Sequence, residues 1–134
     1  MEIEYSEEEI KKIRVENRKY IDLFEKSLKN KKLTEKTIKK HLENIDFYLN
    51  EFVADHYQEG FDKAHLYLDD FYYYLLQKCL WATSTEIRGV AASLKKFYKC
   101  MCDNNIITKM DLSELTDSIK IGLEYCLEFD KSCY

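Results

Sequence analysis

A chain of 134 residues, 46% hydrophobic and 34% charged, is long enough to bury a core, and this composition excludes a wholly disordered polypeptide. Its net charge of −4 argues against binding to a polyanion by bulk attraction alone. The sequence has no proline and only three glycines, which favours long helices over short strands joined by tight turns. We therefore expect an all-α fold of four to five helices, packed as one domain over residues 1–134 with no internal boundary.

The first two expected helices cover residues 6–30 and 34–53. Ser6 is the expected N-cap of the first, because three glutamates follow it where the helix dipole favours negative charge. A polar break at residues 30–32 separates the two, and Thr34 is the expected N-cap of the second. The apolar residues of the second lie three or four positions apart and form one stripe, made of Ile38, Leu42, Ile45, Leu49 and Phe52.

A loop is expected at residues 54–62, which contain Gly60, and a third helix at 62–79. The aromatic run Tyr72-Tyr73-Tyr74 leaves a strand as a minor alternative, although no turn residues flank it. These tyrosines and Trp81 can stack on nucleic-acid bases, but packing in the helix core is the stronger explanation for most of them.

The fourth expected helix has the clearest start, because Thr83 and Glu86 have the spacing of a capping box. Residues 103–105 end it. Gly89, with small neighbours, is expected at a close contact between helices. A fifth helix is expected from Asp111, with Glu114 completing a second capping box.

Positive charge is concentrated in residues 26–40, which carry seven lysines and one acid, a local charge of +6 that leaves −10 for the rest of the chain. A second basic stretch lies on the fourth helix, where Arg88, Lys95 and Lys99 are spaced to share one face opposite the apolar stripe. Such lysines are often only a solvated helix surface. The alternative is a pair of surfaces that bind phosphate groups.

Two blocks carry a family resemblance. Residues 33–52 (LTEKTIKKHLENIDFYLNEF) and 82–98 (ATSTEIRGVAASLKKFY), followed by 104–107 (NNII), resemble the core-binding domain of tyrosine recombinases, the phage integrase family. The resemblance covers residues 8–108 and implies a SAM-like helical bundle that holds one side of a DNA duplex. The DNA-facing residues that it implies are Thr34, Lys36, Thr37, Lys40, Thr85, Arg88, Lys95 and Lys99.

The chain departs from this family in two ways. Members continue into a catalytic domain that supplies an H-x-x-R motif and a nucleophilic tyrosine, but none of the three histidines here has an arginine three residues later. Residues 109–134 form an acidic helix where the family has its linker. The resemblance therefore implies a non-catalytic DNA-binding module, with two alternatives: a protein-interaction or homo-oligomerisation module that uses the acidic helix, and a fragment of a complete recombinase.

No other chemistry is supported by the residue spacing. Cys100 and Cys102 diverge on a helix, and the histidines lack the spacing of a helical metal site, so we expect neither a metal nor a cofactor. The five cysteines, without a secretory signal, indicate reduced thiols in a cytoplasmic protein. Cys79, Cys100 and Cys126 are expected to be buried, and Cys133 to lie at a frayed end. No apolar run approaches the roughly 20 residues that cross a bilayer.

Overall fold

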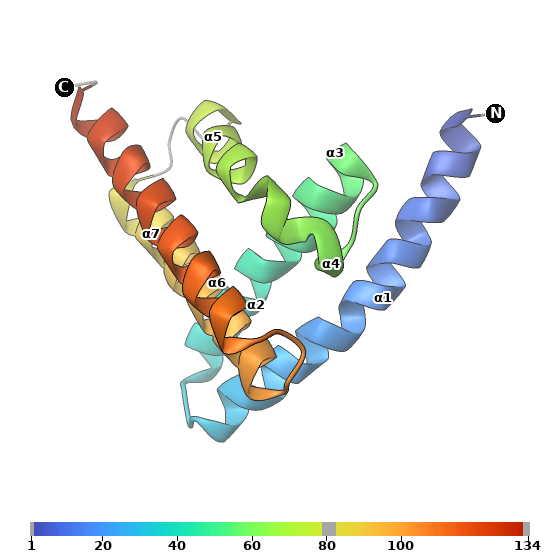
Figure 1. Cartoon of the computed structure of the whole chain (residues 1–134), viewed down its shortest axis with the longest axis horizontal. Coiled ribbons are helices and arrows are strands. Elements are labelled where there is room, and N and C mark those ends of the chain that lie inside the picture. Colours follow the sequence, from blue (N-terminus) through green and yellow to red (C-terminus); the bar gives the residue numbers. More distant parts are fainter. Residues whose placement is uncertain (1, 79–82, 133–134) are drawn as a thin grey trace. The chain divides into compact units, whose positions relative to one another are not determined.

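The computed structural model describes residues 2–78 and 83–132, with side chains placed for 7–77 and 83–128. Every regular element in those residues is helical, so the predicted all-α fold is confirmed and the strand alternative at Tyr72–Tyr74 is wrong. Figure 1 shows these helices in chain order. The expected likeness to a SAM-like bundle stays a prediction.

The chain divides into two compact units, Met1–Leu66 and Tyr67–Tyr134, which we call the N-terminal and C-terminal units. The N-terminal unit contains α1 (Glu2–Asn30), α2 (Glu35–Asp46), the π-helix η1 (Phe47–Ala54), α3 (Asp55–Tyr57) and α4 (Phe61–Ala64). The C-terminal unit contains α5 (Leu68–Lys78), α6 (Ser84–Asp103) and α7 (Lys109–Ser132), and the short 3-10 helix η2 (His65–Tyr67) spans the division. The division falls within residues 62–79, where the sequence predicted one continuous helix.

The first helix of the N-terminal unit begins at Glu2, so the predicted start at Ser6 is wrong, and the acidic residues continue a helix already formed. α1 ends at Asn30 as predicted, and Lys32 turns the chain in a left-handed conformation with φ 58°. Thr34 caps α2, also as predicted, by accepting a hydrogen bond from the Thr37 amide at 3.2 Å. This short turn folds α2 back onto α1.

The structure corrects the predicted second helix, 34–53. It stays helical, but its α-helical part ends at Asp46, and residues 47–54 form the π-helix η1. The i→i+5 bonding of a π-helix brings residues five apart onto one side. Tyr48 then aligns with Val53, and Leu49 with Ala54, and all four side chains are buried. With the 3.6 residues per turn of an α-helix, Tyr48, Leu49 and Val53 would still share one side, but Ala54 would leave it.

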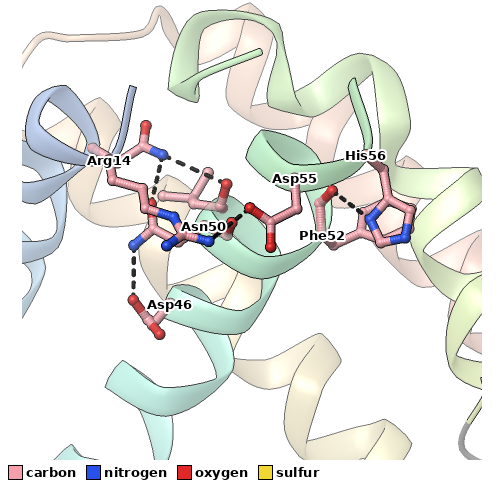
Figure 2. Close-up of polar contacts among 8 residues, drawn as sticks. Arg14, Asp46, Asn50, Phe52, Asp55 and His56 are labelled. Carbon is pink, nitrogen blue, oxygen red and sulfur yellow. Dashed lines mark hydrogen bonds and ion pairs between the residues drawn. The ribbon is translucent and has the colours of Figure 1, made fainter. Parts of the chain in front are cut away.

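A polar network holds α1 against η1 (Figure 2). Asn17, a fully buried polar residue, donates to Asn50 Oδ1 at 2.9 Å and accepts from the Phe61 amide at 3.1 Å, so it joins α1, η1 and α4. The Arg14 guanidinium donates to Asp55 Oδ1 at 2.6 Å, and Nδ2 of the Asn50 side chain donates to Asp46 Oδ1 at 2.7 Å. These bonds fix the register of η1 along α1 and thereby the position of the α1–α2 turn.

The predicted loop at residues 54–62 is much shorter in the structure. Only Gln58–Gly60 is not helical, and Gln58 ends α3 in a left-handed conformation with φ 54°. The predicted third helix, 62–79, is instead divided among α4, η2 and α5. The buried residues Ala64, Leu68 and Phe71, with Phe61 just before this range, carry a helical pattern through the breaks, which explains why the sequence suggested continuity.

In the C-terminal unit, the predicted start and end of the fourth helix are confirmed. Thr83 and Glu86 form the capping box of α6, and the helix ends at Asp103. The predicted box of Asp111 and Glu114 is wrong, because α7 begins at Lys109. Thr108 and Asp111 form the reciprocal bonds, at 3.0 and 3.1 Å. An aspartate three residues after a threonine serves here in place of the glutamate of the usual box.

Close contact between helices occurs at Gly122 and not at Gly89. A Cβ at Gly89 would meet none of the described atoms within 4 Å, so the predicted tight packing there is wrong. A Cβ at Gly122 would lie only 2.5 Å from Cε2 of Tyr72, because α7 crosses α5 at the face of that ring. Tyr72 is buried, and its hydroxyl donates to the Ile119 carbonyl at 3.0 Å. Gly122 is therefore the residue that lets α5 and α7 approach.

Candidate nucleic-acid interface

The turn between α1 and α2 and the first turns of α2 carry a dense group of exposed cations. We call Lys31, Lys32, Lys36, Lys39 and Lys40 the lysine surface. All five side chains are exposed, and none pairs with an acidic side chain among the residues that the structure describes. Their neighbour Lys29 differs, since it pairs with Glu25 at 3.3 Å. The lysine surface is therefore unneutralised by the described part of the chain.

Helix periodicity sets the direction of this surface. Lys36, Lys39 and Lys40 are related as i, i+3 and i+4, so they lie on one side of α2. Ile38 and Ile45, on the other side, are 8% and 0% exposed. Burial of that apolar stripe directs the lysines outward.

The two threonines of the predicted site, Thr34 and Thr37, are exposed but already engaged. The Thr34 hydroxyl donates to Thr37 Oγ1 at 2.9 Å and accepts from the Thr37 amide. This arrangement caps α2 and holds its first turn in place. The two threonines therefore hold Lys36 and Lys40 on a well-formed helix end.

The predicted residues on α6 form a second, smaller basic face. Thr85, Arg88 and Lys99 are exposed and Lys95 is half-buried, and they lie opposite the buried residues Ile87, Leu94 and Phe97, as the spacing predicted. Lys99 is paired with Asp103 of its own helix at 3.1 Å. No described carboxylate of α7 forms an ion pair with Arg88, Lys95 or Lys99, so α7 leaves this face open.

The eight predicted residues thus fall into two groups on different units. Thr34, Lys36, Thr37 and Lys40 belong to the N-terminal unit, and Thr85, Arg88, Lys95 and Lys99 to the C-terminal unit. The structure brings the residues together within each group.

Two cavities of the N-terminal unit differ from the lysine surface in charge. One, of about 550 Å³, lies between α1 and α2 and is lined by Ile21, Ile38 and Leu42, and also by Lys39 of the lysine surface. The other, also of about 550 Å³, lies between α1 and the Gln58–Asp62 segment. Carboxylates outnumber cations in the lining of both. A phosphate group is repelled from such cavities, so the outer side of α2 is the better anion site in this unit.

Metal and thiol chemistry find little support in the described residues. No group of three or more His, Cys, Asp or Glu side chains there is arranged to hold a metal ion. Cys100 and Cys126 are buried, as predicted, while the predictions for Cys79 and Cys133 lie outside the described residues, as does that for Trp81. Burial raises the pKa of the Cys126 thiol to about 11. A thiol with a raised pKa is a poor nucleophile, since the thiolate is the reactive form.

Sequence reasoning missed the outward side of α7. Met110, Ile121 and Tyr125 are 73%, 65% and 60% exposed, opposite the buried residues Ile119 and Cys126. The more regular apolar spacing on this helix, Leu112, Leu115, Ile119 and Leu123, belongs to its inward side. The missed signal is a second apolar spacing on the same helix, because Ile121 and Tyr125 are four residues apart and share a face.

Comparisons of the chain with family models, curated proteins and solved structures found no match. Among the described helices, none is both long enough and apolar enough to cross a membrane.

Proposed function

We propose that this chain is a non-catalytic module that binds duplex DNA by its phosphate backbone. The observation that carries the proposal is the lysine surface, where five exposed cations lie between residues 31 and 40 without an acidic partner in the described residues. Lysines in this state are able to neutralise phosphates and so release the counterions condensed on the DNA. This release supplies most of the affinity for a polyanion. The sequence resemblance to recombinase core-binding domains supports the same assignment.

The proposed binding mode has little sequence preference. Lysine ammonium groups contact phosphates as point charges, whereas base reading requires groups that reach the edges of bases in a groove. The lysine surface offers only ammonium groups. The basic face of α6, with Arg88, Lys95 and Lys99, is proposed as a second contact with DNA phosphates.

Salt dependence tests the proposal directly. We expect a labelled duplex of about 30 base pairs to bind at about 50 mM salt, with a logarithmic salt slope of about −4 to −5 if all five lysines neutralise phosphates. Fluorescence anisotropy across a salt series measures both the affinity and the slope. In the double variant Lys36→Gln/Lys40→Gln, we expect the slope to fall in magnitude by about 2.

A matched control comes from the same unit. Lys11 and Lys12 are exposed lysines of α1, so Lys11→Gln/Lys12→Gln makes the same change in net charge away from the lysine surface. The control is expected to keep the wild-type slope. Equal weakening by both double variants, or no binding of the wild type at low salt, would remove the proposal.

The α6 face has a separate test. We expect Arg88→Gln/Lys95→Gln to lower the salt slope by about 2 if both side chains contact phosphate. An unchanged slope would remove α6 from the interface while leaving the lysine surface in place.

A further inference from the structure

The outward side of α7 combines apolar and acidic side chains. We call Met110, Glu114, Asp117, Ile121, Glu124, Tyr125 and Glu128 the outer face of α7. All seven are exposed, and they lie within one broad arc of the helix, opposite Leu115, Ile119 and Cys126. Large apolar side chains exposed this far and placed side by side indicate a contact surface.

The charge of this face restricts what can cover it. It carries four carboxylates and no cation, since Lys109 and Lys120 lie to one side of the arc. No ion pair joins these carboxylates to any side chain within 7–77 or 83–128. A stable partner must therefore supply cations together with apolar contact area.

The lysine surface has both properties. Its ammonium groups oppose the carboxylates, and its four-carbon stems supply apolar area for Ile121 and Tyr125. The spacing also matches, because Lys36 and Lys40 are one helical turn apart, as are Glu124 and Glu128. The tyrosine ring can also accept an ammonium group on its face.

We propose that the outer face of α7 docks on the lysine surface of a second copy of this chain. The two surfaces are different, so the contact is heterologous and joins copies head to tail. DNA and a second copy then compete for the same lysines. The docking itself does not depend on DNA binding, so the two proposals can fail separately.

Sedimentation velocity over a range of protein concentrations tests the docking. We expect association at about 50 mM salt that disappears at about 500 mM, where exposed charges are screened within a few ångströms. Both Glu124→Lys/Glu128→Lys and Lys36→Glu/Lys40→Glu are expected to weaken it more than about tenfold, because each places like charges together. Ile121→Ser/Tyr125→Ser is expected to weaken it without a change of charge.

The most discriminating experiment mixes the protein reversed on α7 with the protein reversed on the lysine surface. Each is expected to be monomeric alone, and an equimolar mixture is expected to associate again, because the reversed α7 of one protein meets the reversed lysine surface of the other. Restoration in the mixture can only arise between molecules. Glu7→Lys/Glu8→Lys, which alters exposed acids of α1 by the same charge, serves as the matched control and is expected to keep wild-type association.

Three results would overturn the docking proposal. They are a wild-type monomer at every concentration in low salt, association that survives the α7 reversal, and a mixture that stays monomeric. Far-ultraviolet circular dichroism verifies that each variant remains helical. Loss of self-association in Glu124→Lys/Glu128→Lys with DNA binding retained separates this proposal from the DNA proposal.

Discussion

Tyr72 is held at three points within the C-terminal unit. Its ring lies against Gly122, its hydroxyl donates to the Ile119 carbonyl at 3.0 Å, and its own carbonyl lies 4.0 Å from the Cys126 sulfur. Burial, and then the charge of Cys126, raise the pKa of Tyr72 above its ordinary value. The ring cannot swing aside without breaking its hydrogen bond, so the contact between α5 and α7 has little tolerance for added volume.

The two glycines of this unit predict opposite outcomes for the same substitution. Gly122→Ala is expected to lower the free energy of unfolding by about 1–3 kcal/mol, because the new methyl group overlaps the Tyr72 ring. Gly89→Ala is expected to raise it by roughly 0.5–1 kcal/mol, since nothing described opposes the methyl group and alanine favours the helix. Urea denaturation measures both, and a stabilised Gly122→Ala would contradict the packing.

Cys126 predicts a loss of stability in alkali. Burial raises its pKa from 9.0 to about 11, so between those values the unfolded chain has released a proton that the folded chain retains. Unfolding is therefore favoured as the pH rises. The stability that depends on the protonated thiol is fully present below about pH 9 and is lost towards about pH 11. Urea midpoints across this range, in reducing buffer, should fall less steeply for Cys126→Ala than for wild type. Cys102→Ala, which removes a half-buried thiol, should keep the wild-type decline.

At the scale of elements, the helix ends follow short-range rules, and the error at α7 shows which rule applies. Two threonine–acid pairs with the same spacing cap α6 and α7, namely Thr83–Glu86 and Thr108–Asp111. The first pair was predicted from the sequence, whereas the second was placed three residues too late. Aspartate is itself a common N-cap residue. Asp111 was therefore mistaken for the cap, although the cap is Thr108 and Asp111 lies three residues after it.

The corrected cap of α7 can be tested by two substitutions. Thr108→Ala is expected to lower the free energy of unfolding by about 1 kcal/mol, because the Asp111 amide loses its acceptor. Glu114→Ala is expected to change it by less than about 0.5 kcal/mol, since this exposed side chain forms no cap. Thermal and urea unfolding distinguish the two, and the reverse order would restore Asp111 as the cap.

At the scale of the molecule, the division at Leu66 and Tyr67 predicts two regions that respond separately to local damage. Asn17→Ala leaves the Phe61 amide and the Asn50 side chain without a buried partner, at a cost of about 1–3 kcal/mol. Hydrogen exchange in mild denaturant should then accelerate mainly in residues 2–66. Gly122→Ala should accelerate exchange mainly in residues 67–132. Equal acceleration along the whole chain in both variants would contradict two separable units.

The candidate site shows which features a charge pattern in the sequence can predict. The lysines of 31–40 were recognised from sequence because their density is a local property, and the structure leaves all five exposed. The amphipathic spacing of Arg88, Lys95 and Lys99 was likewise sufficient to place them opposite the apolar stripe of α6. The outer face of α7 was missed because an apolar residue such as Ile121 looks like a core residue until its neighbours are known.

The sequence by itself determined the all-α class, the caps of α2 and α6, and the outward direction of both groups of cations. Each of these depends on residues within about one or two helical turns, where spacing and side-chain chemistry suffice. The tertiary structure alone decided the π-helical register of η1, the burial of Asn17 and the close approach at Gly122. Their partners lie far along the chain, as Phe61 does from Asn17 and Ile119 from Tyr72. A spacing rule cannot find such partners, because the fold and not the local sequence brings them into contact.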